Sequence, residues 1–357
     1  VWVQSGNTLL ANYQGTVPLP AASITKVATS LAALSTFGTD HQFITQIGTT
    51  GPIKNGVVQG DLVVQGGEDP MFVWEEAIAL GNFLNQKGIK RVTGNLIITD
   101  KFYMNFEPNP SKSGTFLKTG LNSRLWTRQV QSAYQTLPPG TPRPQVIIDG
   151  SVQVSPATPN NVTPVVRHYS FPLAELLKKM NRFSNNKMAE MVAQSVGGAK
   201  VVAQKAALEA GVPQAEIQLI NGSGLGEENR ISPRAAIAMF FAIQRFLQSQ
   251  NMTVANVFTI VGKDEGILDK RPIPPLAVVK SGSLNRVSAL AGALPTSQGT
   301  VWFAIMNSGG DLERFRAEQE VFLQSFVKQR GAVKSEPAEL IPLADRKTKT
   351  SRSEFLQ

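Results

Sequence analysis

The chain of 357 residues contains no cysteine and only two histidines, His41 and His168. The absence of cysteine excludes disulfide bonds and thiolate chemistry, and it is compatible with an oxidising compartment outside the cytoplasm. A Ser-His-Asp triad or a histidine-rich metal site would have to be built from those two histidines alone. We therefore expect the chemistry of this protein to depend on other residue types.

The sequence also lacks an apolar run long enough to span a membrane, and no signal peptide is recognisable. The chain opens directly on Val1-Trp2-Val3, a stretch typical of a strand, so we expect that preceding residues have been removed. The N-terminus therefore does not indicate a compartment.

Positive charge is in excess, with a formal net charge of +9, but it is scattered along the chain. Net charge is the only feature that supports a nucleic-acid partner, because no stripe of Lys and Arg interleaves with aromatic residues. We therefore expect no nucleic-acid partner. The one dense basic cluster lies between Arg346 and Arg352. We predict that 334–357 is a disordered tail; weak attraction to an anionic surface or polymer is the functional alternative.

Apolar periodicity predicts a mixture of helices and strands. Helices are expected after Ser23 as far as Gly38, and at 74–87, 173–180, 188–196, 199–210, 233–248 and 311–330. Strands are expected at 43–47, 61–65, 91–98, 276–280, 287–291 and 300–306, with hairpins over 1–17 and 146–154. Residues 104–144 are polar and proline-rich and show no clear period.

The chain is long for one domain and suits two. Strands come from both ends and helices from the middle, so we predict one antiparallel sheet flanked by helices, an α/β (α+β) fold with a smaller inserted domain. The expected divisions are a discontinuous catalytic domain of 1–38 and 168–333, an inserted α+β domain of 39–155 and a linker of 156–167.

The stretch Ser23-Ile24-Thr25-Lys26 opens the first long predicted helix. Residues three apart share one helix face, so the Ser23 hydroxyl and the Lys26 amine can meet. If that face is desolvated, Lys26 loses part of its preference for the charged form and can accept the serine proton. The pattern is common by chance, and a capping serine with a surface lysine is the alternative when it is judged alone.

A second stretch, Ser184-Asn185-Asn186, lies where two predicted helices meet. Ser184 and Asn186 are two apart on a turn, so both side chains can point into one cleft. A helix N-cap at Ser184 is the alternative.

A third stretch, Lys280-Ser281-Gly282-Ser283, ends an apolar strand. Gly282 lets another backbone approach closely, and Ser281 and Ser283 project from one face. This arrangement suits an extended peptide that ends in a carboxylate. A strand-edge lysine that prevents aggregation is the alternative for Lys280.

In this order, S-x-x-K, S-x-N and K-S-G are the motif set of penicillin-binding proteins and class A β-lactamases. The sequence from residue 1 to about 330 resembles the D-alanyl-D-alanine carboxypeptidase/endopeptidase family, the low-molecular-mass class C penicillin-binding proteins. Further stretches that carry the resemblance are Gly60-Asp61-Leu62, Gly66-Gly67-Glu68-Asp69-Pro70, Gly94-Asn95-Leu96-Ile97, Asn221-Gly222-Ser223-Gly224-Leu225 and Arg230-Ile231-Ser232-Pro233. The chain departs from the family in Asn221, where Asp is usual, in Ser281, where Thr is commoner, and in an insert with room for one domain rather than two.

The resemblance implies a penicillin-binding-protein/β-lactamase-like transpeptidase fold and acyl transfer at a D-Ala-D-Ala peptide end, without a metal or cofactor. It implies that Ser23 is the nucleophile, that Lys26 is the leading candidate base, and that Ser184 and Lys280 relay the proton to the leaving D-alanine. The backbone N–H groups of Ser23 and Ser283 would form the oxyanion hole.

The resemblance also implies substrate contacts from Asn186 to the peptide amide and from the segment Ser281, Gly282 and Ser283 to the terminal carboxylate. Asp100 is a further candidate contact; a turn aspartate at a strand end is its alternative. The implied partners are peptidoglycan stem peptides, with β-lactam antibiotics as inhibitors, and the implied location is the bacterial periplasm.

Two other functions are weighed against this one. A β-lactamase of the same superfamily needs an efficient deacylating group, and no Glu-x-x-Leu-Asn stretch is present. The match of Tyr103-Met104-Asn105 to a Y-x-N motif is interpreted as chance, because Ser184 and Asn186 already fill that slot. A non-catalytic cell-wall binding protein is disfavoured by the intact motifs. The balance between carboxypeptidase and endopeptidase activity stays open.

Overall fold

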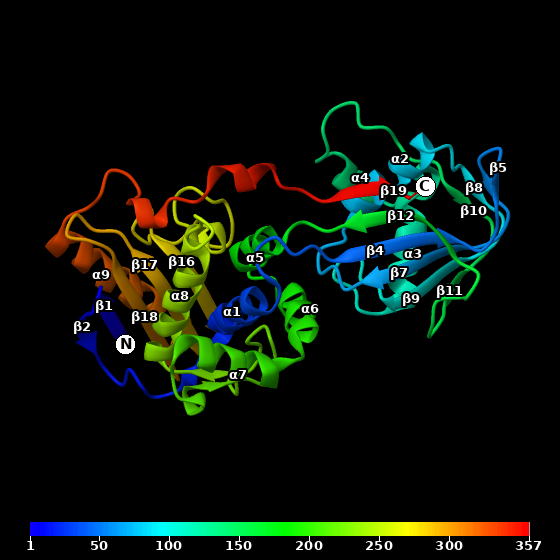
Figure 1. Ribbon diagram of the computed structural model, residues 1–357. Coiled ribbons are helices and arrows are strands. Elements are labelled where there is room, and N and C mark those ends of the chain that lie inside the picture. Colours follow the sequence, from blue (N-terminus) through cyan, green and yellow to red (C-terminus); the bar gives the residue numbers. More distant parts are fainter. Residues whose placement is uncertain (357) are drawn as a thin grey trace. The chain divides into compact units, whose positions relative to one another are not determined.

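The computed structural model describes residues 1–356, apart from the side chain of Lys347. The chain divides into two compact units (Figure 1). Unit 1 comprises Val1–His41 and Leu173–Thr348, and unit 2 comprises Gln42–Pro172 with the C-terminal residues from Lys349. An insertion after the first helix was expected, and the division falls at 41/42 and 172/173 rather than at 38/39 and 167/168.

Unit 1 is built on a six-stranded antiparallel sheet of order β15-β16-β17-β18-β1-β2. The N-terminal strand pairs with β18 through Trp2 and Ala304, so both ends of the chain complete one sheet, as predicted. The strands are β1 (Trp2–Ser5), β2 (Thr8–Asn12), β15 (Thr259–Ile260), β16 (Val278–Leu284), β17 (Val287–Leu294) and β18 (Val301–Ser308).

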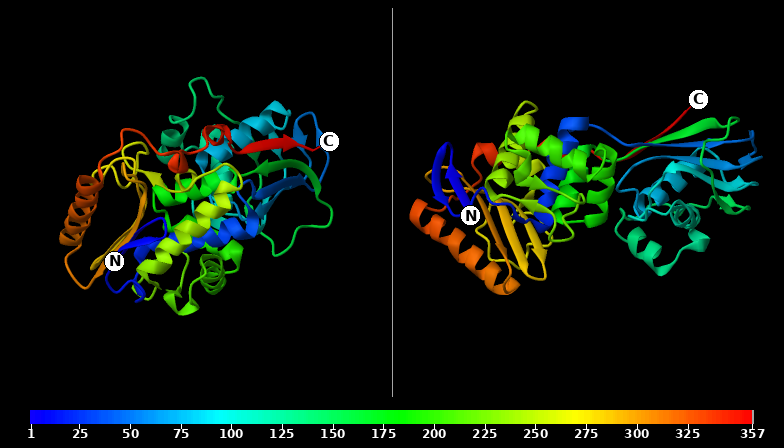
Figure 2. Two further views of the ribbon diagram at one scale, coloured as in Figure 1. Left: turned by 60° about the vertical axis from the view of Figure 1, so that its left-hand side comes forward. Right: turned by 90° about the horizontal axis from the view of Figure 1, so that it is seen from below.

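Helices cover both faces of this sheet, and β17 is buried along its whole length (Figure 2). One face carries the helical layer α1 (Thr25–Phe37), α5 (Leu173–Arg182), α6 (Asn186–Val196), α7 (Ala199–Ala210) and α8 (Pro233–Gln248). The other face carries α9 (Leu312–Arg330). Helix α1 is the centre of the layer, because every residue from Thr25 to Leu34 is buried, and it ends at Gly38 in a positive-φ conformation.

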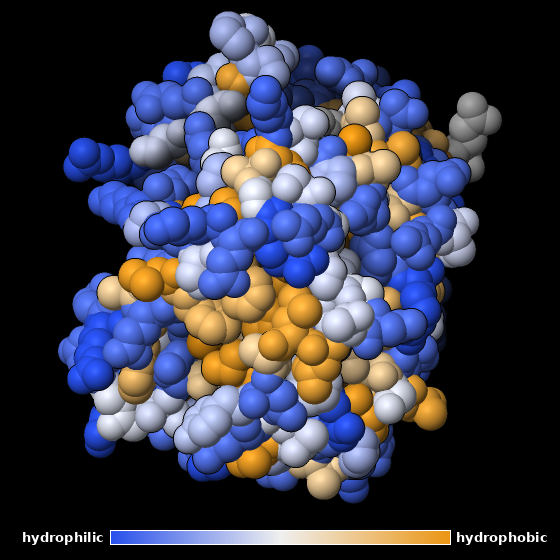
Figure 3. Space-filling model, turned by 90° about the vertical axis from the view of Figure 1, so that its left-hand side faces the viewer, coloured by the Kyte–Doolittle hydropathy of each residue, from blue (hydrophilic) through white to orange (hydrophobic). Residues whose placement is uncertain are grey.

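The inner side of α9 packs on β17, and Leu323 joins the core of Val3, Val279, Leu290 and Phe303. Its outer side leaves Val321 67 % exposed. Apolar side chains gather on the face of unit 1 that carries α9, β1 and β2 (Figure 3).

Unit 2 contains two sheets, of order β11-β9-β7-β4-β12-β19 and β10-β8-β6-β5. Its strands are β4 (Ile44–Thr49), β5 (Ile53–Lys54), β6 (Val57–Val58), β7 (Leu62–Gly67), β8 (Arg91–Val92), β9 (Leu96–Lys101), β10 (Ile147–Ile148), β11 (Val152–Val154), β12 (Thr163–Tyr169) and β19 (Arg352–Phe355). Its helices are α2 (Trp74–Gln86), α3 (Pro110–Gly120) and α4 (Arg128–Tyr134). The core joins apolar residues of both layers, among them Val64, Leu80, Leu96 and Leu117.

Two predictions for this unit are wrong. Residues 146–154 are not a hairpin: β10 pairs in parallel with β8 and β11 with β9, so this stretch runs alongside 91–98. Parallel pairing needs a long crossover, and the stretch 104–144, which showed no period, supplies it with α3 and α4. The side chain of Asn109 caps α3 and Pro110 occupies its first turn, a start signal that is present in the sequence.

Residues 156–167 are not a linker, because β12 begins within them and lies between β4 and β19. His168, on β12, therefore belongs to unit 2, whereas the prediction placed it in the catalytic domain. Its buried imidazole accepts or donates a hydrogen bond at 3.0 Å to Ser353 on β19.

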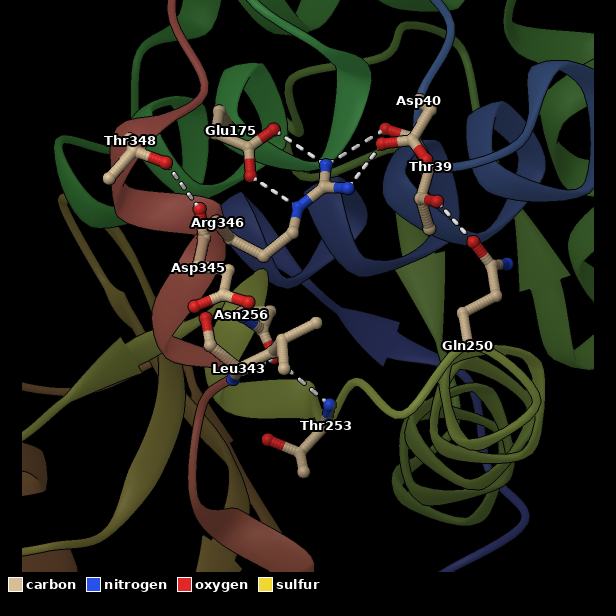
Figure 4. Close-up of polar contacts among 10 residues, drawn as sticks. All are labelled: Thr39, Asp40, Glu175, Gln250, Thr253, Asn256, Leu343, Asp345, Arg346 and Thr348. Atoms are coloured by element: carbon tan, nitrogen blue, oxygen red, sulfur yellow. Dashed lines mark hydrogen bonds and ion pairs between the residues drawn. The ribbon is translucent and has the colours of Figure 1, made fainter.

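The predicted disordered tail is ordered in the structure. Within unit 1 it forms two short 3₁₀ helices, Ala338–Leu340 and Ala344–Thr348, and Leu340 is fully buried. The basic residue Arg346 is buried because Glu175 accepts two hydrogen bonds of 2.7 Å from its guanidinium and Asp40 forms an ion pair with it (Figure 4). Arg346 thus serves as a buried partner of two carboxylates and not as part of a solvated basic tail.

Beyond Thr348 the tail enters unit 2, where β19 pairs antiparallel with β12. Phe355 packs against the core of unit 2, and the backbone N–H of Leu356 donates to Val165. The tail was predicted to be disordered from its composition alone, and composition does not reveal the distant partners that order it.

Candidate active site

Ser23 lies in the short 3₁₀ turn η1 (Ala22–Ile24), directly before α1. The chain reaches this turn through β3 (Leu19–Pro20), which forms a small sheet with β14 (Arg230–Ile231) and β13 (Ile217–Gln218). The helix was expected to follow Ser23, and the structure places Ser23 in the turn that leads into it. Ala22 has a positive φ of 46°, an uncommon conformation for a residue with a side chain.

Lys26 is fully buried in the first turn of α1, and its Nζ lies among three oxygen atoms. It donates to Ser23 Oγ at 2.9 Å, to Asn186 Oδ1 at 2.7 Å and to the Ser223 carbonyl at 2.7 Å. The surface-lysine alternative is therefore wrong. The structure brings together Ser23, Lys26 and Asn186, although the last two are 160 positions apart.

Burial lowers the pKa of Lys26 to about 7, and the nearby negative charge of Glu190 partly offsets this effect. A neutral amine has two N–H groups and one lone pair. In that form Lys26 can keep its bonds to Asn186 and Ser223 and accept the proton of Ser23 Oγ. The geometry and the pKa thus fit a general base that acts near neutral pH.

Ser184 and Asn186 lie at the junction of α5 and α6. Asn185 is the N-cap of α6, with its side chain accepting from the Met188 backbone N–H, so the N-cap alternative for Ser184 is wrong. Ser184 adopts a positive φ of 49°, and its Oγ accepts a hydrogen bond of 2.9 Å from Lys280 Nζ.

Lys280 comes from β16 and is buried, so it is not an aggregation-preventing edge lysine. Besides Ser184, its Nζ contacts the Ser281 carbonyl at 2.6 Å. Burial, and then the charge of Lys26, lower its pKa well below the ordinary value. Both lysines of the site are therefore poised to exchange protons with a serine hydroxyl.

Gly282 brings the backbone of β16 against the turn that contains Ser23. A Cβ at this position would lie 2.8 Å from the Ser23 nitrogen and 2.8 Å from the Ala21 carbonyl oxygen. No side chain larger than hydrogen fits there, so the backbone amide of Ser283 and that of Ser23 come from closely packed segments.

The glycine-rich loop 221–226 closes the site on the side of Lys26, and the residues that hold it in place were not predicted from the sequence. Glu190, four residues after Asn186 on α6, accepts hydrogen bonds from the backbone N–H groups of Gly222 at 3.0 Å and Ser223 at 2.9 Å. Buried Asn229 accepts from the Ile220 and Asn221 N–H groups and donates to the Leu225 and Gly226 carbonyls. The spacing of four from Asn186 was the one sequence signal that could have indicated Glu190.

Asp100 lies in unit 2 at the end of β9, with a positive φ of 53°. It belongs to a different unit from the residues above, so its contact with a substrate stays a prediction. No helix among residues 1–356 combines the length and the apolarity needed to cross a bilayer.

A serine next to a buried lysine of lowered pKa, with a second lysine–serine pair beside it, is an arrangement that suits a serine hydrolase in which lysine replaces the usual histidine. Comparison with known proteins gives the family. The chain belongs to the D-Ala-D-Ala carboxypeptidase 3 (S13) family, whose model matches residues 2–113 and 144–325. The protein is therefore a hydrolase of the serine peptidase class, as the motifs indicated.

Individual relatives agree with this assignment. The D-alanyl-D-alanine carboxypeptidase DacB of Haemophilus influenzae is 23% identical over 86% of this chain and 85% of its own length. The predatory endopeptidase Bd3459 of Bdellovibrio bacteriovorus superposes with a TM-score of 0.78 at 20% identity, covering 96% of both chains. Penicillin binding protein 4 of H. influenzae gives a TM-score of 0.67 at 19% identity, covering 91% of this chain and 95% of that one. The predicted penicillin-binding-protein fold is confirmed.

Solved structures of these two relatives include a penicillin G-acylated form of the Bdellovibrio endopeptidase and a β-lactam complex of the Haemophilus protein.

Proposed function

We propose that this protein is a D-Ala-D-Ala carboxypeptidase that acts on peptidoglycan stem peptides through an acyl-enzyme on Ser23. The observation that carries the proposal is the contact of 2.9 Å between Ser23 Oγ and Lys26 Nζ, a buried amine whose pKa is lowered to about 7. Family membership supplies the substrate class.

In the first step Ser23 Oγ attacks the carbonyl carbon of the penultimate D-alanine, and its proton passes to neutral Lys26. The negative oxygen of the tetrahedral intermediate accepts hydrogen bonds from the backbone N–H groups of Ser23 and Ser283. As the C–N bond breaks, the leaving amine takes a proton through Ser184, whose hydroxyl is held by Lys280 Nζ at 2.9 Å. Water then cleaves the ester and releases the shortened peptide.

Asn186 is proposed to bind the substrate backbone, and the segment Ser281, Gly282 and Ser283 the end of the peptide. Support comes from β16: β15 pairs only with its Val278 and Val279, so the edge beyond them is open to an extended peptide within unit 1. We further propose that β-lactam antibiotics acylate Ser23, that no cofactor takes part, and that the enzyme works in the bacterial periplasm, where stem peptides are found.

The test is the intact mass of the protein after incubation with benzylpenicillin, with peptide mapping of the adduct. We expect one penicilloyl group on Ser23, absent from Ser23→Ala and retained by Ser35→Ala, a control on the outer part of α1. Intact drug without an adduct would refute the acyl-enzyme and favour a non-catalytic binding protein. Hydrolysed drug without an adduct would favour a β-lactamase.

The same protein is then given a pentapeptide stem and a cross-linked dimer. Release of free D-alanine from the pentapeptide is the expected result. Cleavage of the dimer alone would replace the carboxypeptidase proposal with an endopeptidase.

A further inference from the structure

We propose that Arg316 binds the carboxylate of the leaving residue, together with Ser281 and Ser283, and thereby determines the preference of the enzyme for substrates with a free C-terminus. This inference rests on the proposed function of the site. It concerns a residue outside the three motifs, on a helix that the motifs do not include.

The first step is the position of Arg316 relative to β16. Arg316 lies in the second turn of α9, and its Nη2 donates to Ser283 Oγ at 3.0 Å. Ser281 and Ser283 are two apart on the strand, so their side chains share one face. The guanidinium therefore stands beside the strand end where a peptide lying along β16 would place its last residue.

The second step is the hydrogen-bonding capacity that Arg316 keeps. Its Nη1 pairs with the mostly exposed Glu313 at 2.6 Å, while its Nε is buried and has no partner within the described part of the chain. A guanidinium carries five N–H donors, so groups remain for a ligand. Nη1 and Nη2 each keep a second N–H beyond their bonds to Glu313 and Ser283, and the side chain is 29 % exposed, so a carboxylate can reach the guanidinium from solvent.

The third step is charge. The two serines offer neutral hydroxyls, and Lys280 is a poor anchor for an anion because its Nζ is occupied by Ser184 and the Ser281 carbonyl and its pKa is lowered by burial. Arg316 offers a planar guanidinium, the group that matches the geometry of a carboxylate. Of the residues that contact Ser281 or Ser283 through a side chain, it is the one suited to bind a carboxylate in the two-pronged manner typical of arginine.

The fourth step is a comparison within α9. Arg314, two residues earlier, pairs with Glu318 through Nε at 2.8 Å but is 77 % exposed, and among the described residues it forms no bond to β16. Each of the two arginines pairs with a glutamate of the same helix, and they differ in their contact with the strand. Arg314→Ala is therefore the matched control for Arg316→Ala.

The experiment compares paired substrates that differ in one group: a D-Ala-D-Ala peptide and its C-terminal carboxamide, and benzylpenicillin and its methyl ester. For Arg316→Ala we expect kcat/KM for the peptide, and the acylation rate for benzylpenicillin, to fall about 10- to 100-fold, the range for loss of a charge-assisted hydrogen bond. The carboxamide and the methyl ester should change less than about twofold. Arg316→Lys should recover part of the loss, and Arg314→Ala should match the parent enzyme.

Two results would overturn the inference. An equal loss on charged and neutral substrates would show that Arg316 only supports the strand, and no loss on either would show that it has no role in binding. Acylation of Arg316→Ala by the methyl ester serves as the control for a folded, working Ser23. Failure of the parent enzyme to form any adduct would instead refute the proposed function.

Discussion

Replacing Glu190 with glutamine should change how acylation depends on pH. In the parent enzyme the pKa of Lys26 is about 7, so the neutral fraction of its amine is about 0.09 at pH 6 and about 0.9 at pH 8. If neutral Lys26 is the base, the rate of acylation by benzylpenicillin should be about tenfold higher at pH 8 than at pH 6.

The negative charge of Glu190 is what keeps the pKa of Lys26 from falling further. Glu190→Gln removes this charge, so the pKa of Lys26 should drop and the ratio of rates at pH 8 and pH 6 should move from about 10 toward 1. The rate at pH 8 should itself fall severalfold, because glutamine offers one acceptor oxygen to the N–H groups of Gly222 and Ser223 where the carboxylate offered two.

The assay is a rapid-mixing measurement of the second-order acylation rate between pH 5.5 and 8.5. Glu227→Gln, which removes an exposed carboxylate directly after the glycine-rich loop, is the control and should keep the tenfold ratio. A ratio that is unchanged or larger in Glu190→Gln would refute the assignment of Lys26 as the base or of Glu190 as the group that tunes it.

Two further predictions concern stability, and a third concerns the titration of His168. Burial raises the pKa of Asp69 from its ordinary value of 3.8 to about 7, so the folded protein holds that proton more tightly than the unfolded chain. The stability that this proton contributes is complete below pH 3.8 and is lost as the pH rises toward 7, a loss of up to a few kcal/mol. Asp69→Asn should abolish the loss, which denaturant titrations at pH 5 and pH 8 would measure. Arg346→Ala removes a buried guanidinium together with its two hydrogen bonds to Glu175 and its ion pair with Asp40, and it should lower the unfolding free energy by about 3 kcal/mol, against less than about 1 kcal/mol for the exposed Arg314→Ala. Deletion of 349–357 should uncover His168, whose pKa burial lowers to about 4, and its imidazole NMR signal should then titrate near 6.5; a midpoint that stays near 4 would contradict the role assigned to β19.

Local patterns predicted the helices well wherever apolar period and terminal signals agreed. The predicted 199–210 and 233–248 have the bounds of α7 and α8, and α8 begins with the start signals of a Ser232 N-cap and Pro233 in its first turn. The failures were long-range. The parallel pairing of 147–154 with 91–98 and the sixth strand β19 depend on partners far away in the chain, which a single sequence does not reveal.

The residues of the candidate site likewise fall into those that the sequence predicted and those that it did not. Ser23, Lys26, Ser184, Asn186 and Lys280 were named because hydroxyl, amine and amide groups recur at spacings that one chemistry requires, and the structure brings them together. Glu190 and Arg316 were missed because a charged residue on an amphipathic helix has the same sequence pattern whether it faces water or a neighbouring loop. Only tertiary packing distinguishes the two.

The path of the C-terminal segment sets an order of assembly during synthesis. The other strands of unit 2 lie between residues 44 and 169, but β19 follows all of unit 1 in the chain. On a ribosome, the strands β4, β7, β9, β11 and β12 of the six-stranded sheet in unit 2 would emerge and pair before β19 is synthesised, so the edge of β12 would stay unpaired. The inserted unit is thus nearly complete early in synthesis but gains its last strand, β19, only at the end. Until then the chain exposes the open edge of β12, which a chaperone or a protease can recognise.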